Sequence, residues 1–205
     1  MTGAAVIHVV DDDVSFRSSM SRLLQASGYQ TEVYESGDAF LDALPVGEAG
    51  CILLDLQMAG LQGFELQERL VKTGNVLPII FLTAHGDIGA GVKAIKAGAE
   101  DFLPKPVSRE ALFECLDRAL ALNVQQRQQR DRLNAMRSLV ASLTPREAEV
   151  FALVVRGKLN KQIAHELGTT VRTIKAHRQA AMDKLDVRSF AEAVSIAERL
   201  GMLAQ

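Results

Sequence analysis

Short apolar runs alternate with amphipathic stretches through residues 1–122 of the chain. The apolar runs predict five strands, at residues 5–10, 31–35, 51–55, 77–83 and 100–105. The stretches after them carry apolar side chains at helical spacing and predict helices at residues 14–27, 39–44, 64–72, 87–97 and 108–122. Strands that alternate with helices through short loops are typical of an α/β domain with a doubly wound, five-stranded parallel sheet.

Residues 123–141 have a different pattern, because Gln and Arg dominate them and Gly and Pro are absent. Apolar residues return only near their end, at Leu133, Met136, Leu139 and Val140. We expect a helical linker that extends the helix at 108–122. A seam for a partner and a simple solvated connector both fit this pattern.

Residues 142–205 carry the signals of a small all-α domain. Thr144, Pro145 and Glu147 form a capping-box pattern at the start of its first helix. Later helix starts are predicted at Asn160, at Thr169 or Thr170 and at Ser189, and helix ends at Gly157, Gly168 and Gly201. Two of these helices joined by a Gly-containing turn predict a helix-turn-helix motif, with residues 171–184 as its second helix.

The charge of the chain is divided unevenly between these regions. The 205 residues have a formal net charge of −2. Residues 1–123 carry 9 Lys and Arg against 17 Asp and Glu, whereas residues 124–205 carry 14 against 8. The basic part is therefore a candidate for binding nucleic acid, although a solvated surface gives the same composition.

The sequence has no run of about 18 apolar residues, so no membrane span is predicted. Its amino terminus lacks the basic start and the cleavage site of a signal peptide. Cys51 and Cys115 are the only cysteines, and their spacing predicts neither a metal site nor a disulfide framework. We therefore expect a cytoplasmic protein with reduced thiols.

Polar side chains stand at the carboxyl ends of four predicted strands, at Asp11 and Asp12, Asp55, Thr83 and Lys105. The carboxyl ends of parallel strands meet at one edge of the sheet, where ligands bind. Clustered carboxylates repel one another unless a cation joins them, and oxygen ligands suit Mg²⁺. A carboxylate with a metal, a hydroxyl and an ammonium around it predicts a phosphoryl acceptor.

Taken singly, several of these residues have simpler interpretations. Asp13, beside the first pair of acids, is best read as a helix cap. Thr83 alone is an ordinary strand residue, and Lys105 alone is a surface charge. Only their joint position at successive strand ends favours a site.

Four segments resemble the receiver domain of bacterial response regulators: VVDDD, ILLDLQMAGLQGFEL, IIFLTAHGD and GAEDFLPKP. Residues 142–202 resemble the LuxR-type DNA-binding domain, and the combination resembles the NarL/FixJ class, with TAHGD favouring its FixJ-like branch. This resemblance implies a flavodoxin-like receiver at 1–122, a helical linker at 123–141 and a helix-turn-helix domain at 142–205.

The resemblance implies roles for the acidic cluster. Asp55 would accept a phosphoryl group from a histidine of a sensor kinase. Asp11, Asp12 and Asp55, with the backbone carbonyl of Gln57, would hold Mg²⁺.

The resemblance also implies how a phosphoryl group is sensed. Thr83 would move toward it and Lys105 would pair with it. Phe102 takes the position of an aromatic switch whose ring turns inward as Thr83 moves. The Lys105–Pro106 peptide bond is expected to be cis.

The second helix of the helix-turn-helix motif has an apolar face formed by Ile174, Ala181 or Met182, and Leu185. By resemblance, Lys175, Ala176 and Gln179 lie where base edges are contacted. Backbone or structural roles are implied for Lys161, Arg172, Thr173, His177 and Arg178. Thr170 completes the predicted DNA-binding set. Basic side chains there neutralise phosphates.

These features predict a non-enzymatic transcription regulator controlled by phosphorylation of Asp55. Phosphorylation would drive homodimerisation and promoter binding, or would release a masked recognition helix; contact with RNA polymerase is implied only by resemblance. One alternative is a DNA-binding regulator with a silent receiver. Another is a Mg²⁺-dependent aspartyl phosphatase, which would need a second acid at Gln57. His85 and His165 are expected in loop or surface roles.

The sequence departs from the family pattern at two places. Ala59 stands where the family usually has Pro, so we expect a less rigid loop after Asp55. Gly89 and Gly91 weaken the helix predicted from Asp87, since each Gly costs about 1 kcal/mol relative to Ala in a helix interior. One interpretation is that this helix is frayed and becomes ordered on phosphorylation. The other is that tertiary packing compensates for the cost of the two glycines.

Overall fold

The computed structural model describes residues 5–44, 49–75, 77–84 and 88–203 of the chain. The chain divides into two compact units, Met1–Arg127 and Gln128–Gln205. Within the described residues, no helix is both long enough and apolar enough to cross a membrane.

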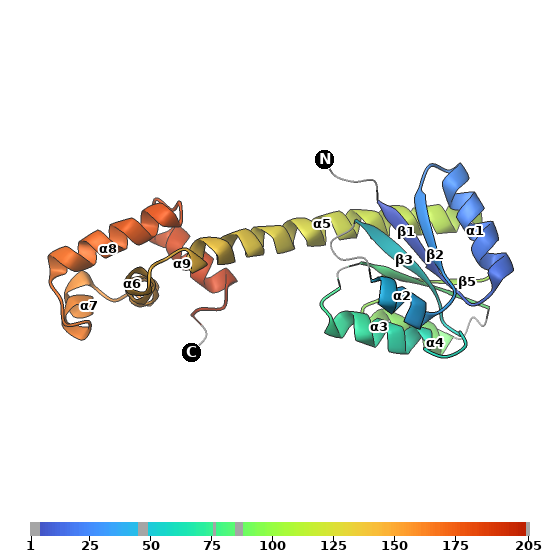
Figure 1. Ribbon diagram of the computed structural model, residues 1–205, viewed down its shortest axis with the longest axis horizontal. Coiled ribbons are helices and arrows are strands. Elements are labelled where there is room, and N and C mark those ends of the chain that lie inside the picture. The colour runs from blue at the N-terminus through green and yellow to red at the C-terminus, as the bar shows by residue number, and fades with distance from the viewer. Residues whose placement is uncertain (1–4, 45–48, 76, 85–87, 204–205) are drawn as a thin grey trace. The chain divides into compact units, whose positions relative to one another are not determined.

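The first unit alternates strands and helices (Figure 1). In chain order these are β1 (Val6–Val10), α1 (Val14–Ala26), β2 (Gln30–Tyr34), α2 (Gly37–Ala43), β3 (Gly50–Asp55), α3 (Gly63–Lys72), β4 (Ile79–Thr83), α4 (Ile88–Lys96), β5 (Asp101–Pro104) and α5 (Arg109–Ala141). The strands form one sheet in the order β2-β1-β3-β4-β5, and every pair is parallel. The predicted doubly wound, five-stranded sheet is confirmed.

Two apolar cores cover the two faces of this sheet. On one face, α1 and α5 pack on Ile7, Leu53 and Ile80. On the other face, α2, α3 and α4 pack on strand residues such as Ile52 and Phe81. Figure 1 shows the two groups of helices on opposite sides of the sheet. Burial on both faces explains why β3 and β4 read as unbroken apolar runs.

Several predicted boundaries in the first unit differ from the structure. The strand predicted at 77–83 begins only at Ile79, because the Leu77 N–H donates to Oδ1 of Asn75 (2.7 Å) in a local turn. The helix predicted at 87–97 is α4, and Asp87 lies outside the described residues. The helix predicted at 108–122 and the linker predicted at 123–141 form one continuous helix, α5.

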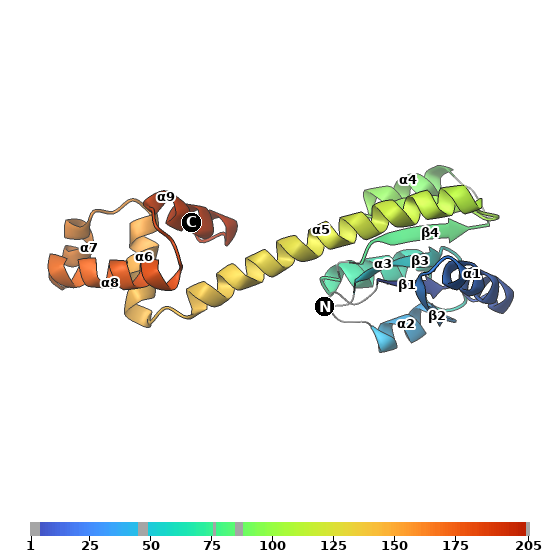
Figure 2. The same ribbon diagram turned by 90° about the horizontal axis from the view of Figure 1, so that it is seen from above.

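The second unit contains the end of α5 and four more helices (Figure 2). These are α6 (Pro145–Val155), α7 (Asn160–Glu166), α8 (Val171–Lys184) and α9 (Phe190–Arg199). Helix α8 packs against both α6 and α7, with the buried side chain of Ile174 in their shared core. Ala181 and Leu185 face the core that α9 completes, so the predicted inward face of this helix is confirmed.

The helix starts of the second unit follow the predicted caps with one exception. Thr144 and Glu147 form the predicted capping box, and Thr170 and Ser189 cap α8 and α9. The prediction that Asn160 caps α7 is wrong. Asn160 is already helical, and its side-chain oxygen accepts from Arg178 (3.3 Å).

The two cysteines are buried in the core between the sheet and α1 and α5. Burial raises the pKa of the Cys115 thiol to about 12, and the Asp101 carboxylate, which accepts a hydrogen bond from this thiol, adds to the rise. Burial also raises the pKa of Cys51. A thiol with such a raised pKa stays protonated at neutral pH and is a poor nucleophile.

Candidate functional site: an acidic cluster and a basic recognition helix

The order of the strands brings the predicted acidic residues together. β1 and β3 are neighbours, and their register pairs Val10 with Leu54. Asp11 and Asp55 are the next residues of these strands, so both carboxylates emerge at the same edge of the sheet. β4 lies on the other side of β3, which brings the end of that strand, Thr83, to this edge as well.

Lys105 bridges the ends of β1 and β3. Its Nζ lies 2.5 Å from Oδ2 of Asp11 and 3.2 Å from Oδ2 of Asp55. The backbone N–H of Lys105 donates to the carbonyl of Thr83 (2.7 Å), which fixes the chain after β5 beside the end of β4. The Lys105–Pro106 bond is cis, as the resemblance implied.

The two carboxylates under Lys105 are largely removed from water. Asp11 is 1% exposed and Asp55 is 9% exposed. Burial raises the pKa of the Asp55 carboxyl above its usual value; the Lys105 ammonium opposes this rise, and the nearby Asp11 carboxylate adds to it. The Gln57 N–H also donates to Oδ1 of Asp55 (3.4 Å).

Asp12 completes the cluster from the exposed side. Oxygen atoms of Asp11, Asp12 and Asp55 lie within 4.8 Å of one another. Carboxylate oxygens at this spacing fit a Mg²⁺ ion, which binds a few carboxylates and completes its shell with water and phosphoryl oxygens. The donor set therefore suits the metal that the sequence pattern predicts.

Phe102 lies on β5, directly beside Phe81 of β4. It is half-buried, and its ring packs against α4 at Gly91. A Cβ atom at position 91 would lie 3.3 Å from that ring, so Gly91 makes room for it. This packing gives a physical reason for one glycine in α4.

Two residues of α1 join the site although the sequence pattern places them only in a helix. The Lys105 ammonium lies 4.1 Å from the centre of the Phe16 ring, a cation–π distance. Arg17 donates to the backbone carbonyl of Asp11 (2.5 Å). Asp13 caps this helix by accepting from the N–H groups of Ser15 and Phe16, as predicted. Phe16 and Arg17 follow Asp12 by four and five residues, a spacing from which their place in the first turn of α1 beside the acids could have been predicted.

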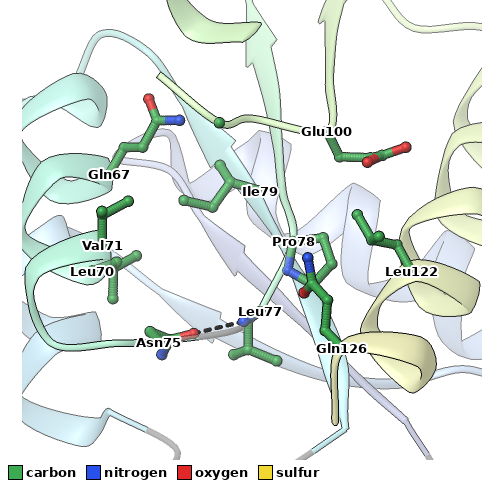
Figure 3. Close-up of a pocket in the computed structure, with 11 residues that line it drawn as sticks. Gln67, Leu70, Val71, Asn75, Leu77, Pro78, Ile79, Glu100, Leu122 and Gln126 are labelled. Carbon is green, nitrogen blue, oxygen red and sulfur yellow. Dashed lines mark hydrogen bonds between the residues drawn. The ribbon is translucent and has the colours of Figure 1, made fainter. Parts of the chain in front are cut away.

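A separate cavity of about 170 Å³ lies at the opposite, amino-terminal edge of the sheet (Figure 3). Side chains of α3, β4 and α5 line it, among them Leu70, Ile79 and Leu122. Asp55 is at the other end of its strand, so this cavity is not part of the acidic cluster.

The predicted DNA-binding residues lie in two environments on α8, on its N-cap Thr170 and, for Lys161, on α7. Exposed residues of the set are Lys161, Thr170, Arg172, Lys175, Ala176 and Gln179, and half-buried ones are Thr173, His177 and Arg178. Gln179 donates to Asp183 one turn later (2.7 Å), an acceptor that the sequence pattern did not single out. His165 is exposed on α7, and His85 lies outside the described residues.

Two family models match the two units. Residues 7–117 match the response regulator receiver domain. Residues 141–197 match the bacterial regulatory proteins of the luxR family.

Several known proteins are similar over nearly the whole chain. The response regulator protein TodT of Pseudomonas putida is 40% identical over 96% of this chain and 87% of its own length. The transcriptional regulatory protein FixJ of Bradyrhizobium diazoefficiens is 37% identical over 99% of each chain. The structure of the response regulator StyR is similar with a TM-score of 0.81 and 43% identity, over 96% of this chain and all of that one. This chain therefore belongs to the response regulators that join a receiver domain to a LuxR-type DNA-binding domain and regulate transcription.

Proposed function

We propose that this response regulator accepts a phosphoryl group on Asp55 from a sensor histidine kinase. The observation that carries the proposal is the convergence of Asp11, Asp12, Asp55 and Lys105 at one edge of the sheet. A carboxylate oxygen of Asp55 forms the new P–O bond as the P–N bond of the phosphohistidine breaks. The leaving imidazole nitrogen keeps the electron pair of the P–N bond and takes a proton from water, so the kinase histidine ends neutral.

The other residues of the cluster would stabilise the negative charge of the phosphoryl group during this transfer. Asp11, Asp12, Asp55 and the Gln57 carbonyl would hold Mg²⁺, which neutralises phosphoryl oxygens when bound. Lys105 already bridges two carboxylates and offers its ammonium to the added oxygens. Thr83, buried at the end of β4, supplies a hydroxyl on the same edge.

An apolar hollow beside Lys105 supports a protein as the donor. Phe16, Met20 and Leu23 of α1 face Pro106 and Val107 across a space of about 430 Å³. An exposed apolar surface next to a reactive carboxylate suits the docking of a helical partner, which can then bring its phosphohistidine to Asp55.

We propose that phosphorylation acts through Phe102 and α4 to form a homodimer. Val92 and Ile95 of α4 are 49% and 47% exposed. Apolar side chains at this spacing on one helix give a surface that a second copy can cover. Phe102 packs against α4 at Gly91, so a rotation of its ring would move that helix.

Dimerisation would then favour promoter DNA binding through two copies of α8. Lys175, Ala176 and Gln179 are exposed on the helix that the helix-turn-helix motif presents to the major groove. A Gln side chain suits adenine and an Ala methyl suits the thymine methyl group. We propose activation of transcription, through RNA polymerase, as the outcome.

The experiment is the intact mass of the wild type and of Asp55→Asn after incubation with acetyl phosphate, with and without Mg²⁺. We expect one Mg²⁺-dependent phosphoryl gain in the wild type and none in Asp55→Asn. Asp42→Asn, at an exposed acid of α2, should behave as the wild type. A chain that gains no phosphoryl group but binds DNA would instead be a regulator with a silent receiver.

A further inference from the structure

The loop between β3 and α3 reaches back to the carboxylates after β1. The backbone N–H of Ala59 donates a hydrogen bond to Oδ2 of Asp12, with N and O 2.9 Å apart. The bond therefore links the ends of two neighbouring strands. Its donor belongs to the backbone of residue 59, so the identity of this residue matters only through its N–H group.

Several contacts fix the direction of this N–H. The side chains on either side, Met58 and Leu61, are buried in the apolar core under α2 and α3. The Gln62 amide donates to the carbonyl of Met58 (2.8 Å). Gly60 has a φ of 79°, a left-handed turn that suits glycine. The loop is thus held by packing and hydrogen bonds without a proline.

Asp12 differs from the other two acids of the cluster. Lys105 binds Asp11 and Asp55, whereas Asp12 has no ion pair among the described residues. Ala59 is the hydrogen-bond donor to its carboxylate in the described part of the chain. The bond occupies one site on Oδ2 and leaves lone pairs of both oxygens for a cation.

Hydrogen bonds of this kind tune metal sites. Carboxylates that bind a metal are themselves hydrogen-bonded, and loss of such a partner costs about 10–100-fold in metal affinity. A held carboxylate also loses less rotamer freedom when the cation binds. Proline has no N–H, so the residue that the family usually carries at this position cannot make the bond.

We propose that Ala59 is a positioning residue whose N–H orients Asp12 for the divalent cation. The chain then binds Mg²⁺ more tightly than the same chain with Pro at position 59. The inference rests on the proposed function, in which Asp12 is a ligand of Mg²⁺.

The test compares Ala59→Pro, which removes the donor, with Ala59→Gly, which keeps it. Mg²⁺ alone is titrated into each full-length chain, and backbone amide shifts of the cluster are followed by NMR. We expect Ala59→Gly to bind Mg²⁺ within about twofold of the wild type. Ala59→Pro should bind about tenfold or more weakly. Equal affinities of the wild type and Ala59→Pro would overturn the inference, as would equal losses in the two variants.

A double-variant comparison separates orientation of Asp12 from a general effect on the loop. In an Asp12→Ala background, Ala59→Pro should cause no further loss of Mg²⁺ affinity; a further tenfold loss would contradict the inference. If Ala59→Pro does not fold, an amide-to-ester replacement at position 59 removes the same N–H and carries the same expectation. A wild type that shows no Mg²⁺-dependent shifts would refute the proposed Mg²⁺ site itself. A wild type that binds Mg²⁺ but is insensitive to the donor refutes only the role of Ala59.

Discussion

The two units of this chain place their candidate functional side chains in opposite environments. In the first unit, Asp11 and Asp55 are buried at the ends of buried strands, under one shared ammonium. In the second unit, Lys175 and Gln179 are exposed, while the core and caps behind them hold the helix. Under the proposed function, reactivity in the first unit would depend on buried charge, whereas DNA recognition in the second unit would depend on charge exposed to water.

This contrast predicts that stability and function are coupled differently. A buried carboxylate is costly to keep ionised, so changes at the acidic cluster alter folding and chemistry together. An exposed cation on a well-capped helix can be removed with little effect on stability. Three experiments test this contrast, in order of the expected effect.

The largest effect is expected from Ile174→Ala. Ile174 is fully buried between α6, α7 and α8, and truncation of such a side chain costs about 2–5 kcal/mol. Calorimetry should show a lower unfolding temperature for the second unit only. Intact mass should show the same phosphoryl gain from acetyl phosphate as in the wild type. Leu112→Ala, on the buried face of α5 that packs on the sheet, should instead lower the unfolding transition of the first unit only. Equal shifts of both transitions in either variant would show that the units fold as one.

An intermediate effect is expected from single cations of α8. DNA binding is measured on a fragment that the wild type selects from random sequences. Arg172→Ala should weaken binding evenly over sequences and lower the salt slope by about 1. Lys175→Ala should relax preference at one base pair by about 1–3 kcal/mol.

The control for the two cation variants is Lys72→Ala, in α3 of the first unit, which should bind DNA as the wild type does. All three variants should keep the melting temperature of the second unit. A loss of stability in Lys175→Ala would contradict the view that recognition there is separate from folding.

The smallest effect is expected from Glu147→Gln. Glu147 is a buried carboxylate of the second unit that accepts hydrogen bonds from Lys184 and Thr144. The hydrogen bond from Lys184 lowers the pKa of Glu147, and the Thr144 N–H adds to this. A carboxyl with a lowered pKa in the folded state adds stability above its ordinary pKa, and that stability is lost as pH falls through the lowered value.

Glu147→Gln should therefore lower the melting temperature of the second unit at pH 7, by less than Ile174→Ala does. The difference from the wild type should vanish as the pH falls below the lowered pKa of Glu147. Glu149→Gln, at an exposed acid of the same helix that pairs with Arg146 (2.7 Å), is the control and should lower the melting temperature at pH 7 less than Glu147→Gln does. If the melting temperatures of Glu147→Gln and the wild type differ by the same amount at every pH, the charge of Glu147 does not contribute to the stability of the second unit.

Most of the fold follows from local pattern. Continuous apolar runs predict β3 and β4, and cap residues predict the starts of α6, α8 and α9. The predicted starts of β4 and α7 are wrong where a side-chain hydrogen bond outside the local pattern determines the conformation. Asn75 turns the chain before β4, and Arg178 binds the side chain of Asn160.

The candidate site is predictable to a similar degree. Parallel strands bring Asp11, Asp55 and Thr83 to one edge by topology alone, so their meeting follows from the order of the strands. The hydrogen bond from the Ala59 N–H to the Asp12 carboxylate has a backbone donor between two neighbouring strand ends, and no pattern of side chains encodes it. The ring of Phe16 below Lys105 likewise depends on the angle at which α1 packs.

The ion pair of Lys184 with Glu147 has a consequence for engineering new operator preference. It joins the end of α8 to the start of α6 (2.7 Å). The ion pair is kept if a foreign recognition helix is grafted only up to residue 183. It is lost if the graft replaces the whole of α8, including Lys184. The exchangeable module is therefore the exposed face of residues 171–183, and the inward residues Ile174 and Ala181 stay with the host.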